Sequence, residues 1–339
     1  MTTQYGEFMK NTRVLLASRP VGLPKTDDWQ IDSVAVNQPG EGEFLGEVLY
    51  ISLDPAMRGW INEGKSYVEP VGLGEVMRAG GVVRVIESRH PDFAVGDHVV
   101  GMSGAQKFWV SNGKGVKKVY PDLAPLPRYL GALGMPGMTA YFGILEVGEL
   151  KEGDTVLVSG AAGAVGALVG QIASLKGCRV IGIAGGEEKC RYITEELGFD
   201  GAVDYKTESL QPAVRKLCPD GIDVYFDNVG GETLDVALSI LRLNARVVIC
   251  GAISQYNKTT APSGPKNYLS LLVNRAKMEG FIVFDFAARY SGAIRDMSRW
   301  IDEGRLQARE HIVEGLETFP ETLLMLFDGR NQGKLIIKV

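Results

Sequence analysis

Residues 155–184 read TVLVSGAAGAVGALVGQIASLKGCRVIGIA, and this stretch decides the fold. A β-branched run leads through a glycine-rich turn into an apolar helical segment, and a second β-branched run follows. The turn spaces Ala161, Gly163 and Gly166 as in the dinucleotide-binding fingerprint, with alanine at the first glycine position. There the middle glycine lets the backbone approach a pyrophosphate, and the last lets helix and strand pack closely. The alternative is a tight turn that binds nothing.

Strand and helix patterns continue to alternate after this turn. We expect strands at residues 201–205, 222–228, 246–253 and 280–284. We expect helices at 187–198, 232–242, 268–278 and 287–303, and one more that follows the strand at 201–205 and ends at 218. Parallel strands need such crossover helices, and β-branched runs are typical of strands buried on both faces. The second half of the chain is therefore predicted to be α/β, a Rossmann domain with a doubly wound parallel sheet.

The first 120 residues show a different pattern of apolar and polar residues. Short apolar or alternating runs at 47–53, 80–88 and 97–102 are bounded by turn residues and predict strands. Four prolines between 121 and 136 indicate a linker. We predict a β-rich domain over residues 1–125 and a Rossmann domain over 126–304. A helix at 318–327 and a strand at 334–339 are expected to return to the first domain.

Composition excludes several classes of function. Lys and Arg (36) against Asp and Glu (41) give a net charge of −5, so we expect no nucleic acid or membrane surface as partner. The N-terminus lacks the apolar run of a secretory signal, and four scattered cysteines suggest neither disulfides nor a zinc cluster. We therefore expect a cytoplasmic protein without a metal. The four cysteines are Cys178, Cys190, Cys218 and Cys250.

The end of the second strand bears on the choice of dinucleotide. An acidic side chain there would bind the 2′-hydroxyl of NAD, but residues 184–186 are Ala-Gly-Gly and Lys189 follows. Small residues leave room for a 2′-phosphate and the lysine supplies its counter-charge, which favours NADP(H). Alternatively, Glu187 and Glu188 simply form the acidic first turn of a solvated helix.

Few polar residues lie in apolar surroundings where chemistry can occur. Asn228 and Tyr256 follow predicted Rossmann strands at their carboxyl ends, where open α/β sheets bind ligands. A phenol is protonated at neutral pH and can donate to a developing oxyanion, although Tyr256 can equally be a core tyrosine. The other candidates are Tyr50, Asp54, Arg58, Thr139, Tyr141, Ser254 and Asn257.

Over essentially its whole length the sequence resembles the zinc-independent medium-chain dehydrogenases/reductases, in the branch of prostaglandin, curcumin and plant double-bond reductases. The resemblance implies a GroES-like β-barrel domain completed by residues 305–339, a Rossmann domain, and a homodimer. It also implies NADPH-dependent reduction of the C=C bond of α,β-unsaturated ketones or aldehydes, with hydride transfer to the β-carbon. The motifs include LYISLDPAMRG (49–59), LGMPGMTAYFGI (133–144), YFDNVGGETLD (225–235), CGAISQYN (250–257) and GLETFPETLLMLFDGRNQGKLIIKV (315–339).

The resemblance also assigns residues to the site. Tyr256 is expected to bond the substrate carbonyl, with Tyr50, Ala56 and Tyr67 at the substrate pocket. Relatives read DPYMR where this chain has Ala56, so the pocket is expected to be roomier or differently shaped, with Trp60 or Tyr67 partly refilling it. The expected NADPH contacts are Ala162, Gly163, Ala164, Val165, Gly166, Lys189, Tyr205, Asn228, Cys250, Gly251, Ala252, Ile253, Ser254, Phe281, Ile282, Val283, Asn331 and Thr139.

Two other functions remain open on the sequence. A quinone reductase of the same fold would also take a hydride without zinc. A non-catalytic NADPH-binding protein would bind the cofactor without turnover.

Overall fold

The computed structural model describes residues 9–64 and 66–339, which divide into two compact units. Unit 1 comprises the described residues up to Leu130, with 310–331 and 335–339, and unit 2 comprises 131–309 with 332–334. The divisions fall slightly later than the boundaries we expected at 125 and 304. Assigning substrate binding to one unit and cofactor binding to the other stays a prediction.

Unit 1 is built around a β-sheet. Among the described residues its strands run in the order β14-β15-β3-β4-β5-β7, with β6 paired to β3, while β1 and β2 pair separately. The runs predicted at 47–53, 80–88 and 97–102 are confirmed as β3, β4 and β5. The bounds are β1 Lys10–Leu16, β2 Trp29–Ala35, β3 Phe44–Ser52, β4 Gly81–Ser88, β5 His98–Gly101, β6 Phe108–Ser111, β7 Lys117–Val119, β14 Glu310–Glu314 and β15 Lys334–Lys338.

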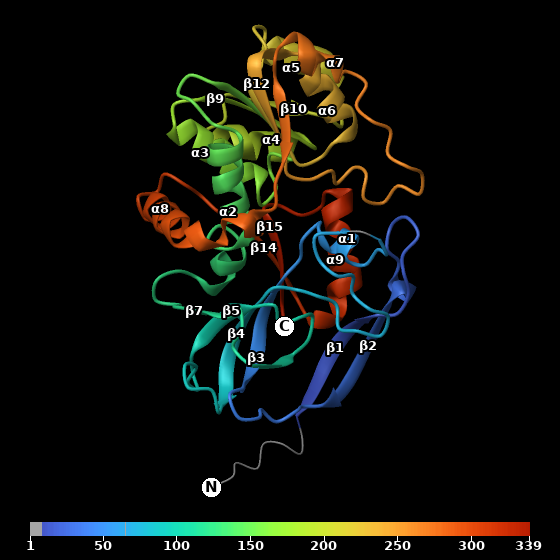
Figure 1. Ribbon diagram of the computed structural model, residues 1–339, viewed down its shortest axis with the longest axis vertical. Helices are drawn as coiled ribbons and strands as arrows, with labels where there is room; N and C mark the ends of the chain where they lie inside the picture. Colours follow the sequence, from blue (N-terminus) through green and yellow to red (C-terminus); the bar gives the residue numbers. More distant parts are fainter. Residues whose placement is uncertain (1–8, 65) are drawn as a thin grey trace. The chain divides into compact units, whose positions relative to one another are not determined.

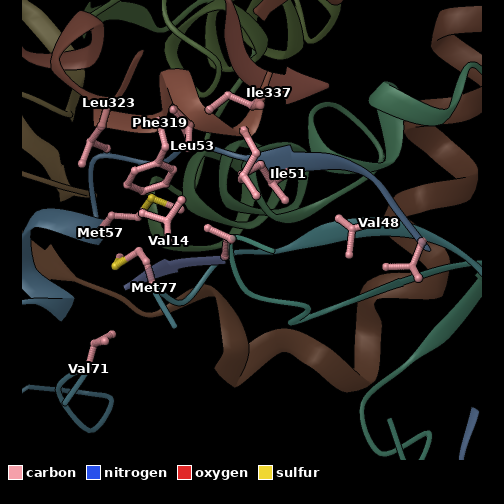
Figure 2. Packing of buried hydrophobic residues seen from close by; sticks show 14 of the residues in the cluster. Val14, Val48, Ile51, Leu53, Met57, Val71, Met77, Phe319, Leu323 and Ile337 are labelled. Carbon is pink, nitrogen blue, oxygen red and sulfur yellow. The ribbon is translucent and has the colours of Figure 1, made fainter. Parts of the chain in front are cut away.

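The core of unit 1 joins segments from both ends of the described chain. Figure 2 shows Val14 of β1 and Ile51 of β3 packed with side chains from α9 (Phe319–Asp328) and β15. Phe319 and Ile337 are fully buried there. Burying each such side chain contributes about 1.5 to 3 kcal/mol. The late segment is therefore an integral part of this core.

Unit 2 contains the doubly wound sheet (Figure 1). Its strands are parallel and run β10-β9-β8-β11-β12-β13, so the chain order reverses between β8 and β11. The strands are β8 Thr155–Ser159, β9 Arg179–Ala184, β10 Gly201–Asp204, β11 Ile222–Asp227, β12 Leu241–Ile249 and β13 Lys277–Gly280. The helices are α2 Met135–Phe142, α3 Gly166–Leu175, α4 Glu187–Arg191, α5 Leu210–Leu217, α6 Gly231–Leu238, α7 Leu269–Val273 and α8 Tyr290–Asp302.

Several predicted elements have different bounds. The helix expected at 268–278 ends at Val273, because Arg275 adopts a left-handed φ of +49° and the Asn274 carbonyl accepts from the Asn244 N–H. The strand that follows begins early and ends at Gly280, so Phe281–Val283 lies beyond it rather than in a strand. The helix predicted at 232–242 ends at Leu238, since β12 begins at Leu241.

Unit 1 also contains the short α-helix α1 (Met57–Trp60). Within the described residues, no helix has the length and apolar character needed to span a membrane. The same part of the chain holds no group of three or more His, Cys, Asp or Glu side chains placed to bind a metal ion.

Candidate functional site

The glycine-rich turn after β8 is tightly packed at Gly166 and more open at Gly163. A Cβ on Gly166 would lie 2.4 Å from the Gly160 carbonyl oxygen and 2.9 Å from the Cα of Ala161, so only glycine lets α3 approach the turn this closely. A Cβ on Gly163 would meet only the Gly160 oxygen, at 3.2 Å. These two positions therefore fit the close-packing and close-approach roles of the fingerprint. Ala161, at the first position, is fully buried.

The end of β9 forms a second open position. A Cβ on Gly185 would lie 2.7 to 2.8 Å from the ring of Tyr205, so the absence of a side chain lets this ring pack against the backbone. Tyr205 is 49% exposed, which leaves much of it available to a ligand. Lys189 is half-buried on α4. The end of β9 therefore has a half-exposed phenol packed on glycine backbone, with Lys189 on the helix that follows.

A carboxylate also lies near this position, but it serves the backbone. Asp204 at the end of β10 accepts from the Gly186 N–H (2.7 Å), the Lys206 N–H (3.0 Å) and the Thr207 hydroxyl (3.0 Å). Burial by itself would raise the pKa of Asp204, but these hydrogen bonds outweigh it and hold the pKa below its usual value. Asp204 thereby fixes the turn at Gly186, where φ is +97°.

Asp227, the last residue of β11, is buried and accepts several hydrogen bonds. Its Oδ1 accepts from the Tyr225 hydroxyl (2.8 Å), the Ser159 hydroxyl (3.0 Å) and the N–H groups of Val229 (3.0 Å) and Gly230 (2.9 Å). Burial, followed by the nearby Asp227 charge, raises the pKa of Tyr225 well above its usual value, so this phenol stays a donor. Asp227 was not among the predicted site residues, although an acid inside the apolar run IDVYFD was a signal.

Asn228 is oriented by β8. Its N–H donates to the Ser159 hydroxyl (2.9 Å) and its side-chain Nδ2 donates to the Ser159 carbonyl (2.7 Å). Ser159 is fully buried, so both acceptors have fixed positions. The hydrogen bond from Nδ2 to β8 fixes the orientation of the amide, so its Oδ1 points away from the Ser159 carbonyl.

Tyr256 lies in a loop attached to the same turn. The Ile253 N–H donates to the Asn228 carbonyl (3.2 Å) and the Ser254 N–H to the Val229 carbonyl (3.1 Å). The Ala252 N–H donates to the Tyr256 hydroxyl at 3.1 Å. A hydroxyl that accepts from an N–H is polarised toward donating its own proton. The structure thus brings Asn228 and Tyr256, predicted separately, onto one hydrogen-bonded surface.

A cavity of about 500 Å³ adjoins the loop, with Asp227, Gly251, Gln255 and Lys258 among its lining residues. Cys250, which precedes the loop, is not a nucleophile in this state. Burial, followed by the Asp227 charge, raises the pKa of its thiol to about 12, so the thiol stays protonated.

The remaining candidates in unit 2 play local roles. The Thr139 hydroxyl donates to the Met135 carbonyl (2.8 Å) within α2, and the Tyr141 hydroxyl donates to Asp296 (2.7 Å). Phe281 and Ile282 are half-buried, and Val283 is buried.

The expected substrate residues in unit 1 do not form one cluster. Tyr50 packs with Val82 and Ile336, whereas Ala56 packs on the separate core that contains Ile51. Tyr50 points to the face of β3 opposite that of its neighbour Ile51, whereas Ala56 lies beyond β3, directly before α1. Tyr67 is 51% exposed and accepts from the Trp60 indole at 3.0 Å.

The other unit 1 candidates are held by hydrogen bonds. Arg58 donates to the carbonyls of Pro20 and Gly22, and Asp54 accepts from the Ser52 hydroxyl. Burial lowers the pKa of Arg58, and the Asp28 charge opposes this effect only in part. Asn331 is half-buried and belongs to unit 1.

Comparison with known proteins places this chain among oxidoreductases. Residues 12–119 match the family model described as the N-terminal domain of oxidoreductase, and residues 164–302 match the one described as zinc-binding dehydrogenase. The chain is 45% identical over 336 residues to the NADPH-dependent curcumin reductase of Escherichia coli, covering 97% of both chains. It is 42% identical over 323 residues to prostaglandin reductase 1 of Bos taurus, covering 94% of this chain and 96% of the relative.

Solved structures agree with this placement. The structure of CurA from Vibrio vulnificus in complex with NADPH is 44% identical, covers 97% of this chain and 99% of its own, and superposes with a TM-score of 0.93. The Escherichia coli quinone oxidoreductase complexed with NADPH is only 18% identical, covers 97% of this chain and 100% of its own, and has a TM-score of 0.77. The second likeness shows the fold alone.

Proposed function

Because the chain belongs to the medium-chain dehydrogenase/reductase family, in the branch of the curcumin and prostaglandin reductases, we propose that it reduces the C=C bond of α,β-unsaturated ketones and aldehydes with NADPH. The observation that carries the proposal is the Tyr256 hydroxyl, which the Ala252 N–H holds in a loop tied to Asn228. Hydrogen-bond donors, rather than a zinc ion, stabilise the substrate oxygen in this proposal.

When bound, NADPH supplies the hydride that reduces the β-carbon. The chain's own residues bind, orient and stabilise. The backbone around Gly163, at the N-terminus of α3, receives the pyrophosphate, while Lys189 offers a cation to the 2′-phosphate. The Tyr256 hydroxyl donates to the substrate carbonyl oxygen and stabilises the negative charge that develops there. The other proposed cofactor contacts are Ala162, Ala164, Val165, Gly166, Tyr205, Asn228, residues 250–254, residues 281–283, Asn331 and Thr139.

Turnover of a substrate panel tests this function. NADPH and NADH oxidation is followed with conjugated enones, enals and quinones of graded size. We expect reduction of enones with a strong preference for NADPH, and the size trend reports the effect of Ala56 on the pocket. Turnover confined to quinones would replace the proposal with a quinone reductase. Cofactor binding without any turnover would favour a binding protein.

Replacing Lys189 by alanine should weaken NADPH binding by roughly 10- to 100-fold, the loss of a charged hydrogen bond worth about 1.5 to 3 kcal/mol. NADH lacks the 2′-phosphate, so its Kd should stay nearly constant. Titration of each cofactor by fluorescence measures both values. Lys216→Ala, an exposed lysine on α5, is the matched control. Equal losses for the two cofactors would contradict the assignment of Lys189 to the 2′-phosphate.

We also propose a homodimer formed through the open edge of the sheet in unit 2. β13 is the outermost strand, and nearby α7 exposes Leu269, Leu272 and Val273 by 59%, 76% and 70%. An open strand edge beside exposed apolar side chains promotes association. Light scattering should give twice the chain mass, and Val273→Lys should shift it toward the monomer, whereas Val21→Lys in unit 1 should not. A monomeric wild-type protein would contradict the dimer.

The compartment we propose is the cytoplasm. The four cysteines are free thiols in the structure, which fits a reducing environment.

A further inference from the structure

Residues Gln332–Lys334 return to unit 2 and touch both of its phosphate-binding elements. Gly333 forms a parallel bridge with Gly163, and its N–H donates to the Ala162 carbonyl at 3.2 Å. The neighbouring side chain, Gln332, donates from Nε2 to the Glu188 carboxylate on α4 at 2.6 Å. One short segment thus joins the glycine-rich turn to the helix that carries Lys189.

Arg309 holds this segment through one side-chain and one backbone hydrogen bond. Its Nη1 donates to Gln332 Oε1 (3.0 Å), and its carbonyl accepts from the Lys334 N–H (2.9 Å). Gly333 has a left-handed φ of +68°, and a Cβ there would lie 2.2 Å from the Arg309 carbonyl oxygen. Only glycine fits this close approach, so the position of Gln332 is set by the backbone on either side of it.

Arg309 is itself held by the π-helical segment that directly follows α4, Tyr192–Glu196. Its Nη2 pairs with Glu196 at 2.8 Å, and its guanidinium lies 4.0 Å from the ring centre of Tyr192. The amide of Gln332 is therefore oriented: Oε1 faces the arginine and Nε2 faces Glu188. This orientation makes Gln332 a donor to Glu188, the acid next to Lys189 in sequence.

We propose that Gln332 is a positioning residue for the cofactor, because its hydrogen bond to Glu188 fixes the spacing between the pyrophosphate turn and Lys189. A dinucleotide with a 2′-phosphate engages both elements and is sensitive to that spacing. A dinucleotide with a 2′-hydroxyl does not engage Lys189. This inference rests on the proposed use of NADPH and goes beyond it by naming what holds the two elements in register.

Binding measurements on substituted proteins test the proposal without turnover. Gln332→Leu keeps the size of the side chain and removes the donor, and it should raise the NADPH Kd about 5- to 20-fold, the usual range for coupled sites, with little change for NADH. Glu188→Ala removes the acceptor and should have the same effect. Glu188→Gln retains an amide oxygen that accepts from Gln332, so it should bind NADPH nearly as wild type does.

The double variant Gln332→Leu/Lys189→Ala separates this idea from the assignment of the cofactor. With Lys189 absent, the spacing has no consequence, so Gln332→Leu should cause no further loss of NADPH affinity. Equal weakening of NADPH and NADH, unequal effects of Gln332→Leu and Glu188→Ala, or full additivity with Lys189→Ala would each overturn the positioning role. A Lys189→Ala variant that binds NADPH normally would instead overturn the 2′-phosphate assignment, and the positioning role would fall with it.

Discussion

A Tyr256→Phe protein should reduce enones with a kcat about 100-fold below wild type, the usual cost of removing one oxyanion donor. Its NADPH Kd should stay unchanged, because the ring remains and the loop keeps the backbone hydrogen bonds from Ile253 and Ser254 to the turn after β11. Steady-state kinetics with saturating enone, together with fluorescence titration of NADPH, measures the two quantities.

The matched control is Tyr129→Phe. The Tyr129 hydroxyl donates to the Tyr120 carbonyl at 2.9 Å within unit 1, so its removal deletes a tyrosine hydroxyl without touching the proposed chemistry. We expect wild-type kcat from this variant. A normal kcat in Tyr256→Phe would remove Tyr256 from the mechanism, and the enone oxygen would need another donor.

The second large effect concerns Gly166. Adding a single methyl group in Gly166→Ala places a carbon 2.4 Å from the Gly160 carbonyl oxygen, and backbone cannot rotate away as a side chain can. We expect a loss of about 1 to 3 kcal/mol in the free energy of unfolding, typical of overpacking. NADPH binding should weaken as well, because the displaced turn is the one proposed to receive the pyrophosphate. Urea unfolding and cofactor titration test the two effects.

A glycine-to-alanine substitution at Gly292 should instead increase the free energy of unfolding. Gly292 lies in α8, and a Cβ there would meet nothing within 4 Å. Gly292→Ala should therefore stabilise the protein by about 0.4 to 1 kcal/mol through the lower entropy of its unfolded chain. Wild-type stability and affinity in Gly166→Ala would show that α3 does not depend on this close approach.

The parallel sheet could be predicted from sequence because its signals are local. Strands β8, β9 and β11 are short apolar runs rich in β-branched residues, each followed by a turn and a helical period, and the glycine spacing at 160–166 is contained in one turn. Burial on both faces leaves little alternative for such runs. The exposed strand β2 was missed, since most of its side chains contact solvent and show no apolar alternation.

Contacts between distant residues could not be predicted in this way. The sequence around Gln332 does not predict its hydrogen bond to Glu188, because that bond depends on the close approach of Gly333 to Arg309 in the folded chain. The opposite orientation of Tyr50 and Ile51 was within reach, since side chains alternate along β3 once its bounds are known. The Asp227 centre could be suspected from its acid in an apolar run, but the donor from Ser159 in β8 could not, because it is distant in the sequence.

The position of β15 has a consequence for the order of events during synthesis. β15 lies between β14 and β3 in the sheet, yet roughly 200 residues separate it from β7, about 10 to 40 s of translation at typical rates. During that interval β3 has emerged from the ribosome with Tyr50–Ser52 lacking their partner strand and the apolar side of Ile51 without Ile337 or Phe319. Unit 2, apart from residues 332–334, is meanwhile already available to fold. The nascent chain is therefore most prone to aggregation, and most in need of chaperones, while it carries a folded second half and an incomplete first half.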